Sequence, residues 1–194
     1  MGLRRYRRCA PLWLSLCFGL TAVFVCPFQA GALPESEASE YQVKAAYLCQ
    51  FLNFVSWPES AVPAPNGSYQ ICVLGVDPFA SDLDNTVRGK RVHGRHVRVQ
   101  RLATASSARG CHILFISTSE RTRLGLILDT ISKLPLLTVS ELQDFEGKGG
   151  MIRFVLEHDN VRLRINPDTS AAAGLQISAK LLAVATVVRG HGGG

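Results

Sequence analysis

The segment YQICVLGVD, residues 69–77, determines the class of fold that this chain can adopt. Its apolar residues follow one another without a regular polar alternation, which is typical of a strand buried on both faces of a parallel sheet. Two further segments have the same character, CHILFIS at 111–117 and LLTVS at 136–140. Between these two, apolar residues recur at helical spacing over 124–134. Strands that alternate with helices over short links predict a mostly parallel α/β sheet.

Two more elements are expected before and within this core. A helix is predicted from Glu40 to Ser56, because its apolar residues line one face and Trp57-Pro58 would end it. The segment His96–Leu102 alternates valines with arginine and glutamine, which indicates a half-exposed strand near a sheet edge.

The last third of the chain predicts a hairpin and a closing helix. The segment Gly149–Asn166 alternates apolar and polar residues on both sides of a turn at His158-Asp159-Asn160. A final helix is expected to follow Ser178 and to include AKLLAVATVV, residues 179–188. The predicted fold class is therefore a single-domain α/β sandwich. Its mostly parallel sheet has a Rossmann or flavodoxin-like order, is extended by an antiparallel β-hairpin, and has helices on both faces.

The first 32 residues have the three parts of a secretory signal peptide. Four arginines precede an apolar run at Leu12–Val25, and Ala30-Gly31-Ala32 offers small residues to a signal peptidase. The alternative is a membrane anchor, but the apolar run is shorter than the roughly 20 residues that span a bilayer. We therefore expect export to the periplasm, cleavage near Ala32, one domain at 33–189 and a disordered tail at 190–194.

Removal of a signal peptide also changes the charge balance of the chain. The sequence has 21 Lys and Arg against 15 Asp and Glu, and four of the basic residues lie in the signal. The mature chain would keep 17 basic and 15 acidic residues, which does not indicate a nucleic-acid partner. The basic segment Arg88–Arg101 is either a nucleic-acid patch or the charged face of an edge strand. Because no aromatic residue interleaves it, we favour the edge strand.

Three of the six cysteines would remain in the mature protein, namely Cys49, Cys72 and Cys111. Cys72 and Cys111 belong to two of the buried strands, which are neighbours in a flavodoxin-like order. They are either two small buried side chains or one disulfide bond, and an oxidising compartment favours the bond. Cys49 lies beside the apolar stripe of the first helix. As a free thiol it would be packed in the core or would form a bridge between molecules.

The chain contains none of the common motifs of catalytic or cofactor sites, such as C-x-x-C, G-x-S-x-G, a P-loop, G-x-G-x-x-G or H-E-x-x-H. We therefore predict no catalytic residues, no cofactor and no metal site. His93 and His96 form a short pair, but the arginines around them oppose a bound cation. A redox enzyme is disfavoured because Cys72 and Cys111 have no resolving thiol near them in the sequence.

One ligand crevice follows from the predicted architecture. In open α/β sheets, ligands bind outside the carboxyl ends of the strands. The loops at this place are GVDPF at 75–79 and STSER at 117–121, and they would supply Asp77, Phe79, Ser119 and Arg121. An alternative function is therefore a periplasmic sensor that binds a small ligand.

Five segments of the chain together resemble the YfiR family of periplasmic proteins, and they cover nearly all of the mature chain. They are VKAAYLCQFLNFVSWP (43–58), YQICVLGVDPF (69–79), GCHILFIS (110–117), GGMIRFVLEHDNVRLRIN (149–166) and AGLQISAKLLAVA (173–185).

The resemblance implies a negative regulator of cyclic di-GMP signalling. Such a protein would bind the periplasmic part of an inner-membrane diguanylate cyclase and hold the cyclase inactive. An outer-membrane peptidoglycan-associated lipoprotein would sequester the repressor, and the released cyclase would favour exopolysaccharide and biofilm. The resemblance also implies a homodimer without catalytic residues and a disulfide between Cys72 and Cys111. Reduction of this disulfide is expected to weaken repression.

A repressor of this kind needs an exposed surface for its partner, and the charged hairpin is the predicted place. The residues expected to bind the partner are Ile152, Arg153, Phe154, Glu157, Arg162 and Arg164. The alternative is that the hairpin arginines form only a solvated face. Arg164 departs from the family pattern, in which an acidic residue is usual at this position.

Overall fold

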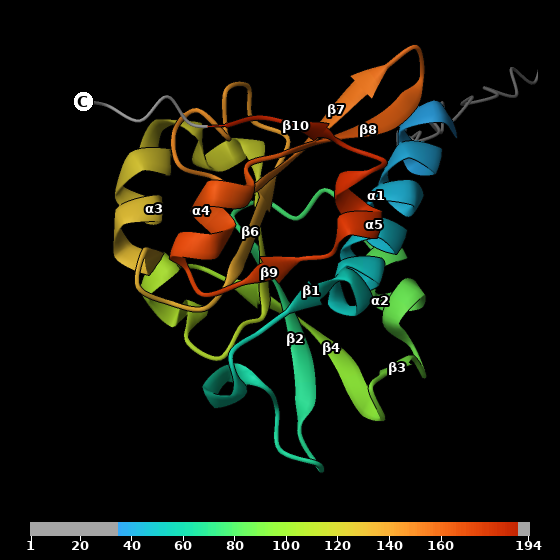
Figure 1. Ribbon diagram of the computed structural model, residues 1–194. Coiled ribbons are helices and arrows are strands. Elements are labelled where there is room, and N and C mark those ends of the chain that lie inside the picture. Colours follow the sequence, from blue (N-terminus) through green and yellow to red (C-terminus); the bar gives the residue numbers. More distant parts are fainter. Residues whose placement is uncertain (1–34, 190–194) are drawn as a thin grey trace, which may run out of the picture. The chain divides into compact units, whose positions relative to one another are not determined.

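Figure 1 shows the computed structural model, which describes residues 35–189 of the chain. The predicted signal peptide, residues 1–32, and the predicted disordered tail, residues 190–194, lie outside the described residues. Within 35–189, no helix has both the length and the apolar character needed to cross a membrane.

The described residues form one sheet of eight strands and a second sheet of two short strands. The strands are β1 (Val55–Ser56), β2 (Ser68–Leu74), β3 (Arg91–Val92), β4 (Arg95–Leu102), β5 (Ile113–Ile116), β6 (Leu137–Ser140), β7 (Ile152–Glu157), β8 (Asn160–Ile165), β9 (Gln176–Ile177) and β10 (Thr186–Val187).

The large sheet has the order β10-β8-β7-β6-β5-β2-β4-β3. Its five central strands run β4-β2-β5-β6-β7 and are all parallel, so in chain order they follow the flavodoxin pattern 2-1-3-4-5. The hairpin strand β8 then pairs antiparallel with β7, and the short β3 pairs antiparallel with β4. The predicted fold class is confirmed.

The helices cover both faces of this sheet. They are α1 (Glu35–Phe54), α2 (Asp82–Val87), α3 (Leu124–Ile131), α4 (Pro167–Ala172) and α5 (Ala179–Leu182), with 3₁₀ turns η1 (Glu59–Ala61), η2 (Ala105–Ala108) and η3 (Thr118–Arg123). Figure 1 shows α1 and α3 on opposite sides of the strands. Alternate residues of β2 therefore enter two cores: Val73 belongs to the core that contains Phe51 on the α1 side, and Leu74 belongs to the core that contains Ile127 on the α3 side.

Two predicted helices end earlier than the sequence indicated. Val55 and Ser56 leave α1 and pair antiparallel with Ile177 and Gln176. The predicted final helix over 179–188 is wrong, because α5 ends at Leu182 and Thr186–Val187 form β10. β10 adds to β8 in parallel, and the β-branched residues of this segment favour the extended conformation.

A disulfide joins Cys72 in β2 to Cys111, which lies two residues before β5. The two Cα atoms are 6.0 Å apart, within the range that the bond requires. Both cysteines are buried on the α3 side of the sheet. The bond therefore ties β2 to the start of its neighbour β5.

Cys49 is the free cysteine of the described residues, and it is buried. Burial raises the pKa of its thiol, while the charge of Lys90 acts in the opposite direction. The position therefore fits the packing role expected of this residue, and the buried thiol is poorly placed for a bridge between molecules.

Replacement of both bonded cysteines by alanine should lower the free energy of unfolding by roughly 4 kcal/mol, because the unfolded chain regains the entropy of an open loop. Cys49→Ala is the matched control, since it removes a buried thiol without opening a loop. Urea unfolding with and without reductant gives the measurement. The interpretation fails if the double variant is as stable as the wild type, or if reductant destabilises that variant further.

Candidate functional site

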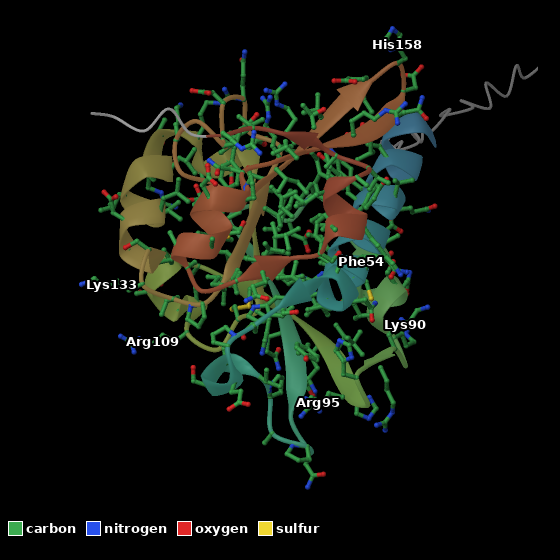
Figure 2. All side chains as sticks on the ribbon, in the orientation of Figure 1. Phe54, Lys90, Arg95, Arg109, Lys133 and His158 are labelled. Atoms are coloured by element: carbon green, nitrogen blue, oxygen red, sulfur yellow. A yellow bond between two sulfur atoms is a disulfide. The ribbon has the colours of Figure 1, made fainter. Side chains whose placement is uncertain are left out.

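The hairpin of β7 and β8 is the predicted partner surface, and its turn is built from two residues in the left-handed region. His158 and Asp159 have φ angles of 50° and 59°. Two successive residues with positive φ form the tight turn that matches the twist of two antiparallel strands. Figure 2 shows His158 at the outer end of the hairpin.

Two of the six predicted partner residues face the core. Ile152 has no exposed surface and Phe154 is 2% exposed, and both belong to the α1-side core. Phe154 stacks on Phe51 with 6.1 Å between the ring centroids. Ile152 and Phe154 therefore cannot contact a partner in this structure, because the alternation of the strand turns them inward.

Arg153 and Arg164 are opposite each other on the outward face of the hairpin, and one carboxylate lies between them. The carboxylate belongs to Glu146, which is only 4% exposed. Arg164 Nε donates to Glu146 Oε1 at 2.6 Å. Arg153 Nε lies 2.9 Å from Glu146 Oε2 in an ion pair, although these two atoms lack the alignment of a hydrogen bond.

This arrangement explains how two arginines can occupy opposite positions of neighbouring strands. Like charges in such a pair destabilise a sheet, and the buried carboxylate compensates for both. Arg153 and Arg164 are therefore engaged at the base of the hairpin. No pattern in the sequence indicates the role of Glu146, since its loop has no periodic pattern and its partners lie 7 and 18 positions away.

The outer part of the hairpin remains exposed. We define the hairpin tip as residues 156–162. Glu157 and Arg162 are exposed there without an ion pair among the described residues, and Leu156 is 50% exposed. Asp159 adds a further exposed negative charge at the turn, so the tip combines three charges with the apolar side chain of Leu156.

The predicted crevice at the ends of β2 and β5 is closed by contacts within the protein. Asp77 Oδ2 accepts from Arg101 Nε at 2.8 Å, and Asp77 Oδ1 accepts from the backbone N–H of Phe79 at 2.8 Å. Phe79 is fully buried and packs against Phe115. Of the four predicted crevice residues, only Ser119 and Arg121 are exposed.

Ser119 closes this crevice together with a glycine. Its Oγ accepts from the backbone N–H of Val76 at 3.0 Å. Gly75 has a φ of 91°, and a Cβ at this position would lie 2.4 Å from Ser119 Oγ. The two loops can therefore approach each other only because residue 75 has no side chain.

Arg101 holds the same region from the side of β4. Its Nη1 and Nη2 donate to the carboxylate of Asp84 at 2.9 and 2.5 Å, which lowers the pKa of Asp84. Since Arg101 also binds Asp77, it joins the loop after β2 to α2. Asp77 is thus part of a structural ion pair and is not a free crevice group.

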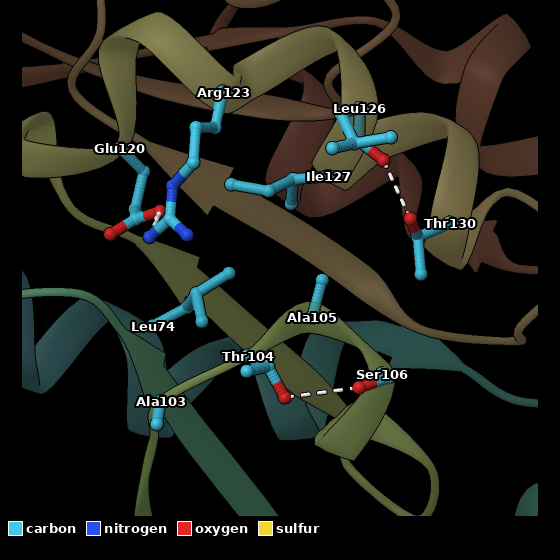
Figure 3. A pocket seen from close by; sticks show the side chains of 10 residues that line it. All are labelled: Leu74, Ala103, Thr104, Ala105, Ser106, Glu120, Arg123, Leu126, Ile127 and Thr130. Carbon is cyan, nitrogen blue, oxygen red and sulfur yellow. Dashed lines mark hydrogen bonds and ion pairs between the residues drawn. The ribbon is translucent and has the colours of Figure 1, made fainter.

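A small pocket of about 220 Å³ lies next to the closed crevice, between η2 and α3 (Figure 3). Some of its polar groups pair with one another: Arg123 Nη2 pairs with Glu120 Oε2 at 2.6 Å, and the Thr104 and Ser106 hydroxyls lie 3.0 Å apart. The Arg123 side chain is 58% exposed, so its other donors face solvent. Leu74 and Ile127 form its apolar wall. The pocket therefore offers little chemistry for a polar ligand.

His112 is buried next to the disulfide and is neutral. Its Nδ1 accepts from the backbone N–H of Gln70 at 3.0 Å, so its Nε2 carries the proton and donates to the carbonyl of Ala61 at 2.9 Å. Burial lowers the pKa of His112 below its ordinary value of 6.5, and the hydrogen bond to Ala61 acts in the opposite direction.

The described residues contain no group of three or more His, Cys, Asp or Glu side chains that could hold a metal ion. Of the predicted short pair His93 and His96, the second has its Nε2 2.7 Å from a guanidinium nitrogen of Arg91. The Nε2 atom of His96 therefore accepts a hydrogen bond from the positively charged guanidinium group of Arg91.

Comparison with known proteins identifies a family and a fold. A family model described as YfiR/HmsC-like matches residues 41–186. No curated protein matches the sequence. The crystal structure of a conserved domain protein from Vibrio cholerae O1 biovar El Tor is similar with a TM-score of 0.52 and 10% sequence identity. The similarity covers 76% of this chain and 59% of that chain, and at this identity it shows the fold alone.

Glu146→Gln should lower the free energy of unfolding by about 3 kcal/mol, because two opposed and partly buried arginines lose their common carboxylate. Glu157→Gln is the matched control at an exposed position and should change stability by less than about 0.5 kcal/mol. Urea unfolding of the two variants measures the difference. Equal stabilities would show that the carboxylate does not hold the hairpin.

Acid should destabilise the protein through His112. Its neutral form is favoured in the folded state, so the contribution is complete above the unfolded pKa of about 6.5 and is lost as the pH falls towards the lower folded pKa. The free energy of unfolding, measured between about pH 7.5 and about pH 5.5, should therefore fall more steeply in the wild type than in His112→Gln. His158→Gln, at the exposed turn, is the matched control for the substitution. Parallel slopes for the wild type and His112→Gln would contradict this account.

Proposed function

The chain belongs to the YfiR/HmsC-like family of periplasmic regulators of cyclic di-GMP signalling, and we propose that it is the repressor of an inner-membrane diguanylate cyclase. The exported domain, freed of residues 1–32, binds the periplasmic part of the cyclase and holds it inactive. Lower cyclic di-GMP then restrains exopolysaccharide and biofilm formation. The family match over 41–186, which includes nearly every described element, is the observation that carries this proposal.

The hairpin tip is the proposed contact surface. Two of its free charges, Glu157 and Arg162, can pair with a partner without breaking an internal ion pair. Leu156 adds exposed apolar surface beside them. The base of the hairpin is held by Glu146, so binding would order few residues and would cost little conformational entropy. Arg153 and Arg164 hold the base of the hairpin through their ion pairs with Glu146.

Two partners and one chemical signal complete the proposal. An outer-membrane peptidoglycan-associated lipoprotein competes for the repressor, and the repressor acts as a homodimer. Reduction of Cys72–Cys111 relieves repression, because β2 and the start of β5 would lose their covalent link. The proposed action is binding alone and requires no catalytic residue or cofactor.

Deletion of the gene should raise cellular cyclic di-GMP, and Arg162→Glu should raise it towards the level of the deletion. Figure 2 shows the exposed Arg109 far from the hairpin end marked by His158, so Arg109→Glu is the matched charge reversal and should leave repression intact. Cyclic di-GMP is measured in cell extracts, and copurification of the diguanylate cyclase is measured in parallel.

The outcomes test the repressor function and the proposed contact surface separately. Unchanged cyclic di-GMP after deletion would refute the repressor. A deletion effect together with full cyclase copurification by Arg162→Glu would refute the hairpin tip and leave the repressor in place.

A further inference from the structure

A second cavity, of about 340 Å³, lies at the carboxyl ends of β5 and β6. Thr118 follows β5 and Glu141 follows β6, while α1 and β7 form its two sides. Ligands of parallel α/β sheets bind at this end of the strands. The polar lining residues are Glu40, Lys44, Thr118, Glu141, Gln143 and Arg153.

The α1 side of the cavity is a fixed wall of paired charges. Lys44 is 3% exposed and forms ion pairs with Glu40 Oε1 and Glu141 Oε2. Glu141 Oε1 accepts from the hydroxyl of Tyr41 at 2.9 Å. Both oxygens of Glu141 are thus occupied, whereas Glu40 Oε2 has no donor within residues 40–189.

Arg153, on the β7 side, has unused hydrogen-bond donors. Its side chain is 15% exposed and its Nε faces Glu146, but its two Nη groups meet no acceptor in the described part of the chain. The side chains of Thr118 and Gln143 have no partner there either. Arg101 differs, because each of its guanidinium nitrogens reaches an oxygen of Asp77, Asp84 or Ala80.

Unused donors on a largely buried guanidinium favour an oxyanion as ligand. The free Nη groups of an arginine bind a carboxylate or a phosphate through two parallel hydrogen bonds. Of the Arg153 nitrogens only Nε is buried without a hydrogen bond, so the two Nη groups reach the solvent of the cavity, where a bound anion can replace water. Arg153 therefore supplies the anion-binding end of the cavity.

The carboxylates of the opposite wall restrict the class of this oxyanion. On this wall Glu40 and Glu141 carry two negative charges, whereas Lys44 carries one positive charge. The wall would therefore repel a dianion. A ligand with one carboxylate and one hydrogen-bond donor can bind at both the Arg153 end and the Glu40 end of the cavity. We propose that this cavity binds a small hydroxy- or amino-carboxylate, with its carboxylate on the Arg153 Nη groups and its hydroxyl or ammonium group on Glu40 Oε2.

The ligand contacts proposed for this site do not depend on the proposed repressor function. Leu156 of the tip also lines the cavity, whereas the charged tip residues Glu157 and Arg162 do not. Its ligand would bridge α1 and β7, and so would stabilise the folded chain in proportion to its occupancy.

Calorimetric titration of the purified mature protein tests the proposal with four probes: L-serine, glycolate, acetate and inorganic phosphate. L-serine or glycolate should bind, and acetate should bind more weakly because it has no donor for Glu40. Arg153→Lys keeps the charge beside Glu146 but loses the guanidinium, and it should weaken binding about tenfold, the equivalent of one hydrogen bond to a charged group. Glu40→Gln should abolish the preference for L-serine or glycolate over acetate.

Arg164→Lys is the matched control for the arginine. It makes the same substitution at the other partner of Glu146, outside this cavity, and should leave binding unchanged. Thermal unfolding of each variant establishes that the variant is folded. Thr118→Val, a substitution at an exposed position, should also weaken ligand binding. Absence of heat with both L-serine and glycolate would overturn the proposal. So would equal weakening by Arg153→Lys and Arg164→Lys, or phosphate as the tightest ligand.

Discussion

The outer half of the sheet depends on the ion pairs that the carboxylate of Glu146 forms. β7 continues the parallel core, but it pairs with β6 over only two residues, and β8 is attached only to β7 and the short β10. Glu146 lies in the loop between β6 and β7 and reaches both hairpin strands through their arginines. Its backbone carbonyl also accepts from Asn166, which follows β8. One buried charge thereby fixes the direction in which the hairpin leaves the sheet.

The opposite end of the central strands is held by different chemistry. The disulfide and the neutral His112 both act just before β5, where they bind β2 and the turn η1. Redox state and pH are therefore expected to act on this end, whereas the hairpin depends on ion pairs. A regulator that works by binding needs its partner surface to remain in one orientation, and these two sets of interactions supply that rigidity.

The parallel core could be predicted from the sequence because each strand is a short apolar run and its neighbours are helical or polar. The hairpin was equally visible from its alternation and its turn residues. The last helix was predicted wrongly, since 183–188 is apolar and its pairing with β8 is a tertiary effect. The prediction that Ile152 and Phe154 bind the partner conflicts with the alternation of their strand, which places both side chains on the apolar face. The pairing of Glu146 with Arg153 and Arg164, and the cavity beside Arg153, unite segments that no local pattern connects.

The central claim is that this rigid domain represses a diguanylate cyclase by presenting a hairpin that Glu146 holds in place. The most direct measurement is the rate of cyclic di-GMP synthesis by inner-membrane vesicles that contain the cyclase, with purified mature protein added to the periplasmic face. The account predicts that the wild-type protein lowers this rate and that folded Glu146→Gln lowers it much less. A rate that the wild-type protein leaves unchanged, or that both proteins lower equally, would contradict the account.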